Sequence, residues 1–192
     1  MAKAKVVTNL DAQATNAKNA RIIARTRLDE LYEWDAYVDD PYHVHELHNL
    51  RIAAKRLRYT LEIFQDVLPE TTVSCIKEVE GIQEELGSLH DHDVMIALLR
   101  LCLGSQDSGS GYEYALVGAA HNSGKGQFVL NPTLVAHLLD PASTPSAEQR
   151  QGLEVLLSNL QRGREKLYDT FRQHWYQLKG RDFRRELVNL LD

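Results

Sequence analysis

Residues 45–64 read HELHNLRIAAKRLRYTLEIF. When this stretch is wound as an α-helix, its apolar side chains fall on one side: Leu50, Leu57, Leu61 and Phe64. An arc of about 80° on the other side holds most of the basic residues: His48, Arg51, Lys55 and Arg58, with Glu62 at its end. We call the first four residues the basic arc. Arg56 lies away from it. The pattern predicts an amphipathic helix from about residue 44 to 67, closed by Pro69.

Three further long helices are predicted, and they make the fold all-α. We expect them at about residues 12–36, 71–103 and 146–179, with a short fifth helix at about 181–191. The last long stretch carries an apolar stripe at helical spacing: Leu153, Leu157, Leu160, Leu167, Phe171, Trp175 and Leu178. Four long amphipathic helices bury their stripes most simply as an antiparallel four-helix bundle.

Length and spacing favour one domain. The chain has 192 residues, enough for one domain with its own core and few for two. Residues 104–146 differ from their surroundings in Gly, Ser and Pro content, which is typical of loops. We interpret them as an insertion between the third and fourth helices of a single domain spanning residues 1–192.

Composition narrows the class of protein. The formal net charge of −5 argues against a nucleic-acid binder, which would usually be basic. No apolar run is long enough to cross a membrane, and residues 1–18 lack the continuous apolar core of a secretory signal. Cys75 and Cys102 lie among apolar residues, as reduced, buried thiols do. We therefore expect a cytoplasmic protein without membrane or nucleic-acid partners.

Charge is strongly segregated along the chain. Residues 29–46 hold seven acids and no Lys or Arg, whereas residues 47–65 hold four bases and one acid. Cations at helical spacing repel one another unless an anion compensates them. Arginine binds phosphate through two parallel hydrogen bonds, and the basic arc from Arg51 to Arg58 spans roughly 10 Å, which suits a row of phosphates. The alternatives are a solvated basic face, or one paired with acids of the same chain.

Two motifs in this order resemble the CHAD family, the conserved histidine α-helical domain. HNLRIAAKRLR, residues 48–58, resembles the family's basic helix, and LGSLHD, residues 86–91, resembles the motif on its next helix. The resemblance covers residues 15–103 and 147–179. It implies binding of inorganic polyphosphate without catalysis, and by position it assigns the contact to the basic arc and Arg56: His48, Arg51, Lys55, Arg56 and Arg58.

The basic motif occurs once in this chain, whereas the family commonly carries two similar bundles with one motif each. The resemblance therefore implies a single bundle. A homodimer that restores the two-bundle arrangement is the expected oligomer. The family's link to polyphosphate granules makes these granules a candidate location within the cytoplasm.

Secondary candidates lie on the first and fourth helices. Arg21 and Arg25 are one turn apart and could face the same ligand, or pair with the acids at 29–40. Arg164 interrupts the apolar stripe of the fourth helix, so its charge must find a carboxylate such as Asp91 or Asp93, or a ligand. Arg162 and Lys166 share another face of that helix and complete the secondary set.

Asp91 and Asp93 alternate with His90 and His92, which raises the question of a metal ion. Consecutive helical residues point about 100° apart, so the four cannot converge on one ion. We expect both aspartates to orient arginines of the second helix. No cofactor is predicted, except that the two aspartates together could hold a divalent cation accompanying the phosphate.

Two other functions stay open. One is a metal-assisted phosphohydrolase in which Asp91 and Asp93 hold the ion. The other is an adaptor bundle whose basic stripe pairs with an acidic protein partner. The sequence contains no G-x-S-x-G, phosphate-binding glycine loop, C-x-x-C or H-E-x-x-H motif, which favours a binding module over an enzyme.

Overall fold

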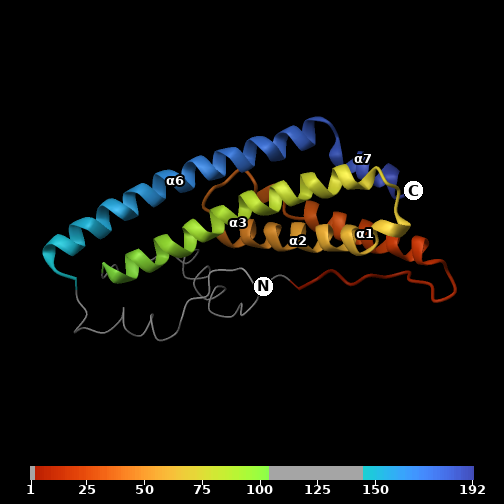
Figure 1. The fold of residues 1–192 in the computed structure, drawn as a ribbon, viewed down its shortest axis with the longest axis horizontal. Coiled ribbons are helices and arrows are strands. Elements are labelled where there is room, and N and C mark those ends of the chain that lie inside the picture. The colour runs from red at the N-terminus through yellow and green to blue at the C-terminus, as the bar shows by residue number, and fades with distance from the viewer. Residues whose placement is uncertain (1–2, 104–144) are drawn as a thin grey trace. The chain divides into compact units, whose positions relative to one another are not determined.

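The computed structural model describes residues 3–103 and 145–192, and its regular structure there is entirely helical. This part of the chain contains five α-helices and two short 3-10 helices: α1 (Asn16–Tyr32), η1 (Asp35–Tyr37), α2 (Val44–Ile63), η2 (Gln65–Val67), α3 (Thr72–Cys102), α6 (Ala147–Gly180) and α7 (Phe183–Leu190). Figure 1 labels the α-helices. The all-α class is confirmed. Residues 104–144 of the predicted insertion lie outside the described residues.

The helix ends differ from the sequence prediction where local hydrogen bonds intervene. Helix α1 begins at Asn16 because the Thr15 side chain accepts a hydrogen bond from the backbone N–H of Lys18 at 3.3 Å, which caps the helix. The predicted start at residue 12 is therefore wrong. Helix α2 ends at Ile63, and the predicted continuation to residue 67 is the separate 3-10 turn η2.

The described residues group into two compact units. The first contains residues 3–40, 46–86 and 170–192, and the second contains residues 41–45, 87–103 and 145–169. Helices α3 and α6 each contribute to both. Whether residues 1–192 act as one domain stays a prediction.

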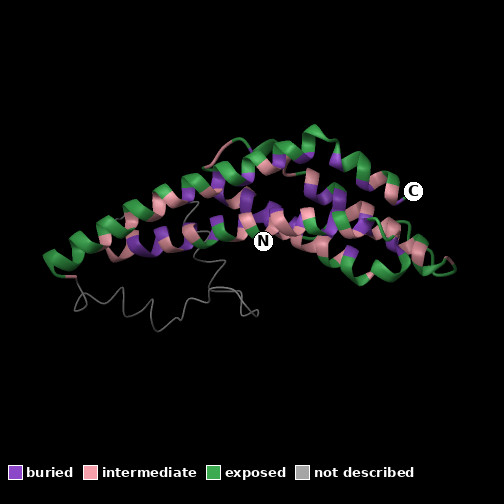
Figure 2. Cartoon of the chain, turned by 45° about the horizontal axis from the view of Figure 1, so that its top comes forward, coloured by how far each residue is buried: buried purple, intermediate pink, exposed green. Residues whose placement is uncertain are grey.

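The first unit holds the largest apolar core. Leu50, Leu57 and Leu61 are fully buried, which confirms the apolar side of α2, while Phe64 is only half-buried. From α6, Phe171 and Trp175 join them, and the Trp175 ring lies 5.5 Å from that of Tyr32 on α1. Figure 2 marks the buried positions in purple. That the helices form an antiparallel bundle of four stays a prediction.

The second unit is built from the last turns of α3 and the first part of α6. Its buried side chains come mainly from α3: Leu89, Val94, Ile96, Ala97, Leu98 and Leu99. The predicted apolar positions of α6 in this unit are only half-buried: Leu153, Leu157, Leu160 and Leu167. Within the described residues, no helix combines the length and apolar character that a membrane span requires.

Candidate functional site

The deeper half of the basic arc is buried. His48 is 3% exposed and Arg51 is 8% exposed, and they belong to a run of five consecutive buried residues at 47–51. Five consecutive residues go more than once around a helix, so α2 is covered on every side here. The helical wheel predicted an apolar side and an opposite basic side, but at this level of α2 both sides are covered.

The other half of the basic arc reaches the surface. Lys55 and Arg58 are half-buried, and both lie beside Tyr59, which is 42% exposed. The Lys55 Nζ lies 5.5 Å from the centroid of this ring and the Arg58 guanidinium carbon lies 5.0 Å from it. Both cations therefore contact one aromatic side chain, whose electron-rich ring face attracts positive charge.

An acid of α3 and an acid of α2 itself compensate the charge of Arg58, but neither compensates that of Lys55. The Nη1 atom of Arg58 donates to Glu80 of α3 at 2.8 Å, and its Nε lies 3.5 Å from Glu62, one turn further along α2. Within residues 3–103 and 145–192, Lys55 forms no ion pair. It is thus the cation of the basic arc that an incoming anion meets with no carboxylate to displace.

Arg56 is tied to helix α1. Its guanidinium forms an ion pair with Glu30, a buried acid that also accepts a hydrogen bond from Arg27 at 2.7 Å. One carboxylate so neutralises part of the charge of two arginines. This contact holds α2 against α1, and it gives Arg56 a structural role whether or not a ligand is present.

Arg21 and Arg25 share a partner that the sequence did not indicate. Arg21 donates to the backbone carbonyl of Asp192 at 3.1 Å, and Arg25 forms an ion pair with the side chain of the same residue. Among the described residues, neither pairs with the acids at 29–40. The two arginines do lie together, and with Lys18 they line the same open pocket.

The buried arginine of α6 has found a carboxylate. Arg164 is 5% exposed and forms an ion pair with Asp93, which is 2% exposed, while its Nη2 donates to the carbonyl of Pro41 at 2.7 Å. Arg164 thus has one of the two carboxylate partners considered for it, Asp93. The prediction that Asp93 orients an arginine of the second helix is wrong, because its partner belongs to α6. Burial raises the pKa of Asp93, and Arg164 opposes that rise by attracting the ionised form.

The remaining predicted residues lie on the surface. Arg162 is exposed and donates to Asn159 at 2.6 Å, and both Lys166 and Asp91 are exposed as well. In the part of the chain that the structure describes, no group of three or more His, Cys, Asp and Glu side chains is arranged to hold a metal ion. A cation held by two aspartates and phosphate oxygens is a different kind of site and stays a prediction.

Sequence reasoning missed the residues that receive these cations. Glu30 is one acid among seven in residues 29–46, and nothing in the pattern singles it out as the partner of Arg56. Glu78 and Glu85 lie seven residues apart and so on one side of α3, a usable signal, but not one that names His174 of α6, which lies between them.

The motifs of α2 and α3 lie within a stretch that matches a known protein family. The sequence model of the CHAD domain matches residues 2–100, just over half of the chain. The chain belongs to the CHAD family. The match covers α1, α2 and nearly all of α3, including the basic arc, and it leaves α6 and α7 outside, so the resemblance over residues 147–179 stays a prediction. The chain has no significant match among curated proteins or solved structures.

Proposed function

We propose that this CHAD protein binds inorganic polyphosphate, without catalysis, through the surface formed by Lys55, Arg58 and Tyr59. The observation that carries the proposal is the pairing of two cations around one exposed ring, one of them with no carboxylate partner in the described part of the chain. Membership of the CHAD family, for which polyphosphate is the expected ligand, supports it.

The surface suits a chain of phosphates for a physical reason. Lys55 and Arg58 are three residues apart, so they lie about 4.5 Å apart along the helix axis, and neighbouring phosphates can contact both. Arg58 offers a planar fork and Lys55 a mobile point charge. We assign His48 and Arg51 to the inner end of the site, which polyphosphate reaches only if it penetrates below the surface. We assign Arg56 to holding α2 in place against α1.

A titration with long-chain polyphosphate at moderate salt tests the proposal. The double variant Lys55→Ala/Arg58→Ala should bind at least about tenfold more weakly, because two charge-assisted contacts are lost. Its salt dependence should also be shallower, by about one charge for each lost contact. The matched control is Lys77→Ala/Arg185→Ala, which removes the same charges from exposed positions on α3 and α7. Equal weakening in both double variants would reduce the effect to net charge and overturn the proposal.

Absence of catalysis is part of the proposal and has its own test. We expect no phosphate release from polyphosphate or nucleotides with Mg²⁺ or Mn²⁺ present, and no need for a metal in binding. Release that Asp91→Asn abolishes would instead favour the metal-assisted phosphohydrolase, with Asp91 and Asp93 as ligands.

The single basic motif leads to a proposal about assembly. We propose that two chains pair when polyphosphate is bound, because each carries one motif where the family commonly carries two. Light scattering coupled to gel filtration should show the dimer mass with polyphosphate and less of it without.

We also propose a location in the cell. A fluorescent fusion should follow polyphosphate granules in the cytoplasm, and the Lys55→Ala/Arg58→Ala variant should not.

A further inference from the structure

The second unit contains a pocket that the basic arc does not use. Its volume is about 360 Å³, within the range of small-molecule sites, and its polar lining comes from three segments: Tyr42, Arg100 of α3, and Ser158, Gln161, Arg162, Arg164 and Glu165 of α6. No residue of this pocket belongs to the basic arc.

Arg164 forms the buried wall of the pocket. Within the described residues it makes two hydrogen-bonding contacts, one from Nε to Asp93 and one from Nη2 to Pro41. A guanidinium carries five N–H donors, so Nη1 and one hydrogen of Nη2 have no protein acceptor there. No atom of Arg164 is among the buried side-chain atoms that lack a partner, so these donors face the open pocket, where the oxygen of a ligand can accept from them in place of water.

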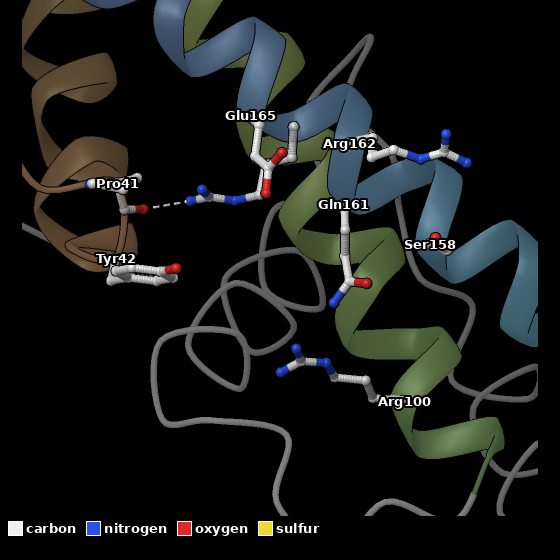
Figure 3. A pocket seen from close by; sticks show the side chains of 8 residues that line it. Pro41, Tyr42, Arg100, Ser158, Gln161, Arg162 and Glu165 are labelled. Carbon is white, nitrogen blue, oxygen red and sulfur yellow. Dashed lines mark hydrogen bonds between the residues drawn. The ribbon is translucent and has the colours of Figure 1, made fainter.

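The other polar side chains converge on the same space. In Figure 3 the amide of Gln161 and the guanidinium of Arg100 point toward one another on the side of α3 that faces Pro41 and Tyr42, and the Tyr42 ring lies across from them. Arg162 points away from them. Glu165 is the one acid in the lining, and Asp93 compensates Arg164, but the N–H donors of Arg100, Arg164 and Gln161 surround this space, so the pocket favours a ligand whose oxygens accept hydrogen bonds.

We propose that this pocket binds a small phosphate-bearing molecule, at a site separate from the polyphosphate surface. Arg100 and the free donors of Arg164 would take the phosphate oxygens, as arginines do in bidentate contacts, and Gln161 would add an amide donor. Tyr42 is 78% exposed, and its ring offers a face at the mouth of the pocket on which a base can stack. Inorganic pyrophosphate and a nucleoside diphosphate share this chemistry, and they differ in their use of Tyr42.

Calorimetric titration of the full chain with pyrophosphate and with ADP tests the site. It is best done in the Lys55→Ala/Arg58→Ala background, so that the polyphosphate surface does not contribute. We expect both probes to bind, and Arg100→Ala to weaken both by at least about tenfold, whereas Arg150→Ala, which removes an exposed arginine of α6 outside the pocket, should change affinity little. A Gln161→Ala variant should weaken binding more mildly.

The two probes separate the ligand classes. If ADP binds more tightly and Tyr42→Ala brings it to the level of pyrophosphate, the ligand is a nucleotide; equal affinities that Tyr42→Ala leaves unchanged assign the inorganic anion. No binding of either probe, or equal weakening by Arg100→Ala and Arg150→Ala, would overturn the proposal. Because the polyphosphate test uses other residues, either site can fail while the other stands.

Discussion

Lys55 and Arg58 lie about one turn apart on α2, but they differ in the side chains that surround their charges. Glu80 and Glu62 lie against Arg58, while Lys55 has only the Tyr59 ring near its charge in the described part of the chain. An anion that binds Arg58 must compete with these acids, and one that binds Lys55 need not. The affinity of the surface is therefore set partly by its acids.

Glu80→Gln should strengthen polyphosphate binding. The variant removes a carboxylate that lies 2.8 Å from Arg58 and repels phosphate, while the amide can still accept from the arginine. Since the Arg58–Glu80 pair is partly exposed, we expect a gain of about two- to fivefold, in line with surface ion pairs of under about 1 kcal/mol. Glu84→Gln, an exposed neighbour on the same helix, is the control. A gain of the same size in both variants would mean that only net charge had changed.

Asp93→Asn should destabilise the protein far more than Asp91→Asn. The first change leaves Arg164 buried without its counter-charge, and breaking a buried ion pair in this way costs about 3–5 kcal/mol. The second removes an exposed carboxylate and should stay within about 0.5 kcal/mol. Urea unfolding followed by circular dichroism measures both. Similar free energies of unfolding for the two variants would contradict the structural role of the Asp93–Arg164 pair.

Helices α3 and α6 are joined in the first unit by a histidine between two acids. The Nε2 atom of His174 lies 3.1 Å from Glu78 and its Nδ1 lies 3.0 Å from Glu85. Arg181 contacts Glu78 as well, at 2.9 Å. This tie fixes the position of the His174 ring, which has consequences for acid stability and for the glycine that faces it.

Acid should weaken the tie through Glu78. Burial alone would raise the pKa of Glu78, but hydrogen bonds from His174 and Arg181 outweigh it and hold this pKa below its usual value. A carboxyl group with a lowered folded pKa contributes stability above its unfolded pKa and loses it as pH falls through the folded one. We therefore expect Glu78→Gln to flatten the decline of the urea midpoint below about pH 4, compared with wild type and with Glu84→Gln. A slope equal to that of wild type would contradict this linkage.

Gly81→Ala should be unfavourable although alanine suits a helix better. A Cβ at Gly81 would lie 3.0 Å from Cε1 of His174, and this ring cannot retreat easily while Glu78 and Glu85 hold it. Gly152→Ala on α6 meets nothing within 4 Å and should gain about 0.5–1 kcal/mol in free energy of unfolding. In a His174→Ala background, Gly81→Ala should also become stabilising. The prediction fails if Gly81→Ala stabilises the wild-type chain as much as Gly152→Ala does.

Sequence patterns predicted the helices better than the site. Five helical segments were predicted and are present, because periodic Leu and Phe positions and the punctuation by Pro and Gly carry that information locally. The burial of His48 and Arg51 could not be predicted in the same way, because a wheel gives the direction of a side chain and not what packs over it. Arg164 interrupts an apolar stripe, so the sequence indicates that its charge needs a partner. Arg56 lies outside such a stripe, and the sequence gives no such signal for it.

At the scale of the whole chain, the boundaries of the family match differ from those of the two compact units. The family match at 2–100 coincides with neither compact unit, since each unit takes residues from inside and outside that range. The basic arc belongs to the first unit and the arginine pocket to the second. Sequence periodicity could not reveal this division, because α3 and α6 continue through it without a break in helical pattern.

Local stability should change along α6. Between Ala147 and Leu160 none of its residues is buried, whereas Phe171, Trp175 and Leu178 are. Helical segments with few buried contacts open at a small fraction of the global free energy. In hydrogen–deuterium exchange, amides of residues 150–160 should exchange well before those of residues 171–178. Uniform protection along the whole helix would count against this expectation.

The ion pairs of α2 bear on its use outside the fold. In the protein, Arg56 is held by Glu30 of α1 and Arg58 by Glu80 of α3, and His48 is enclosed. A synthetic peptide of residues 44–63 would leave both acids behind and release every one of these charges into water. Such a mimic would bind polyanions more avidly and less selectively than its parent, so the motif cannot be transplanted as a cassette without the helices that restrain it.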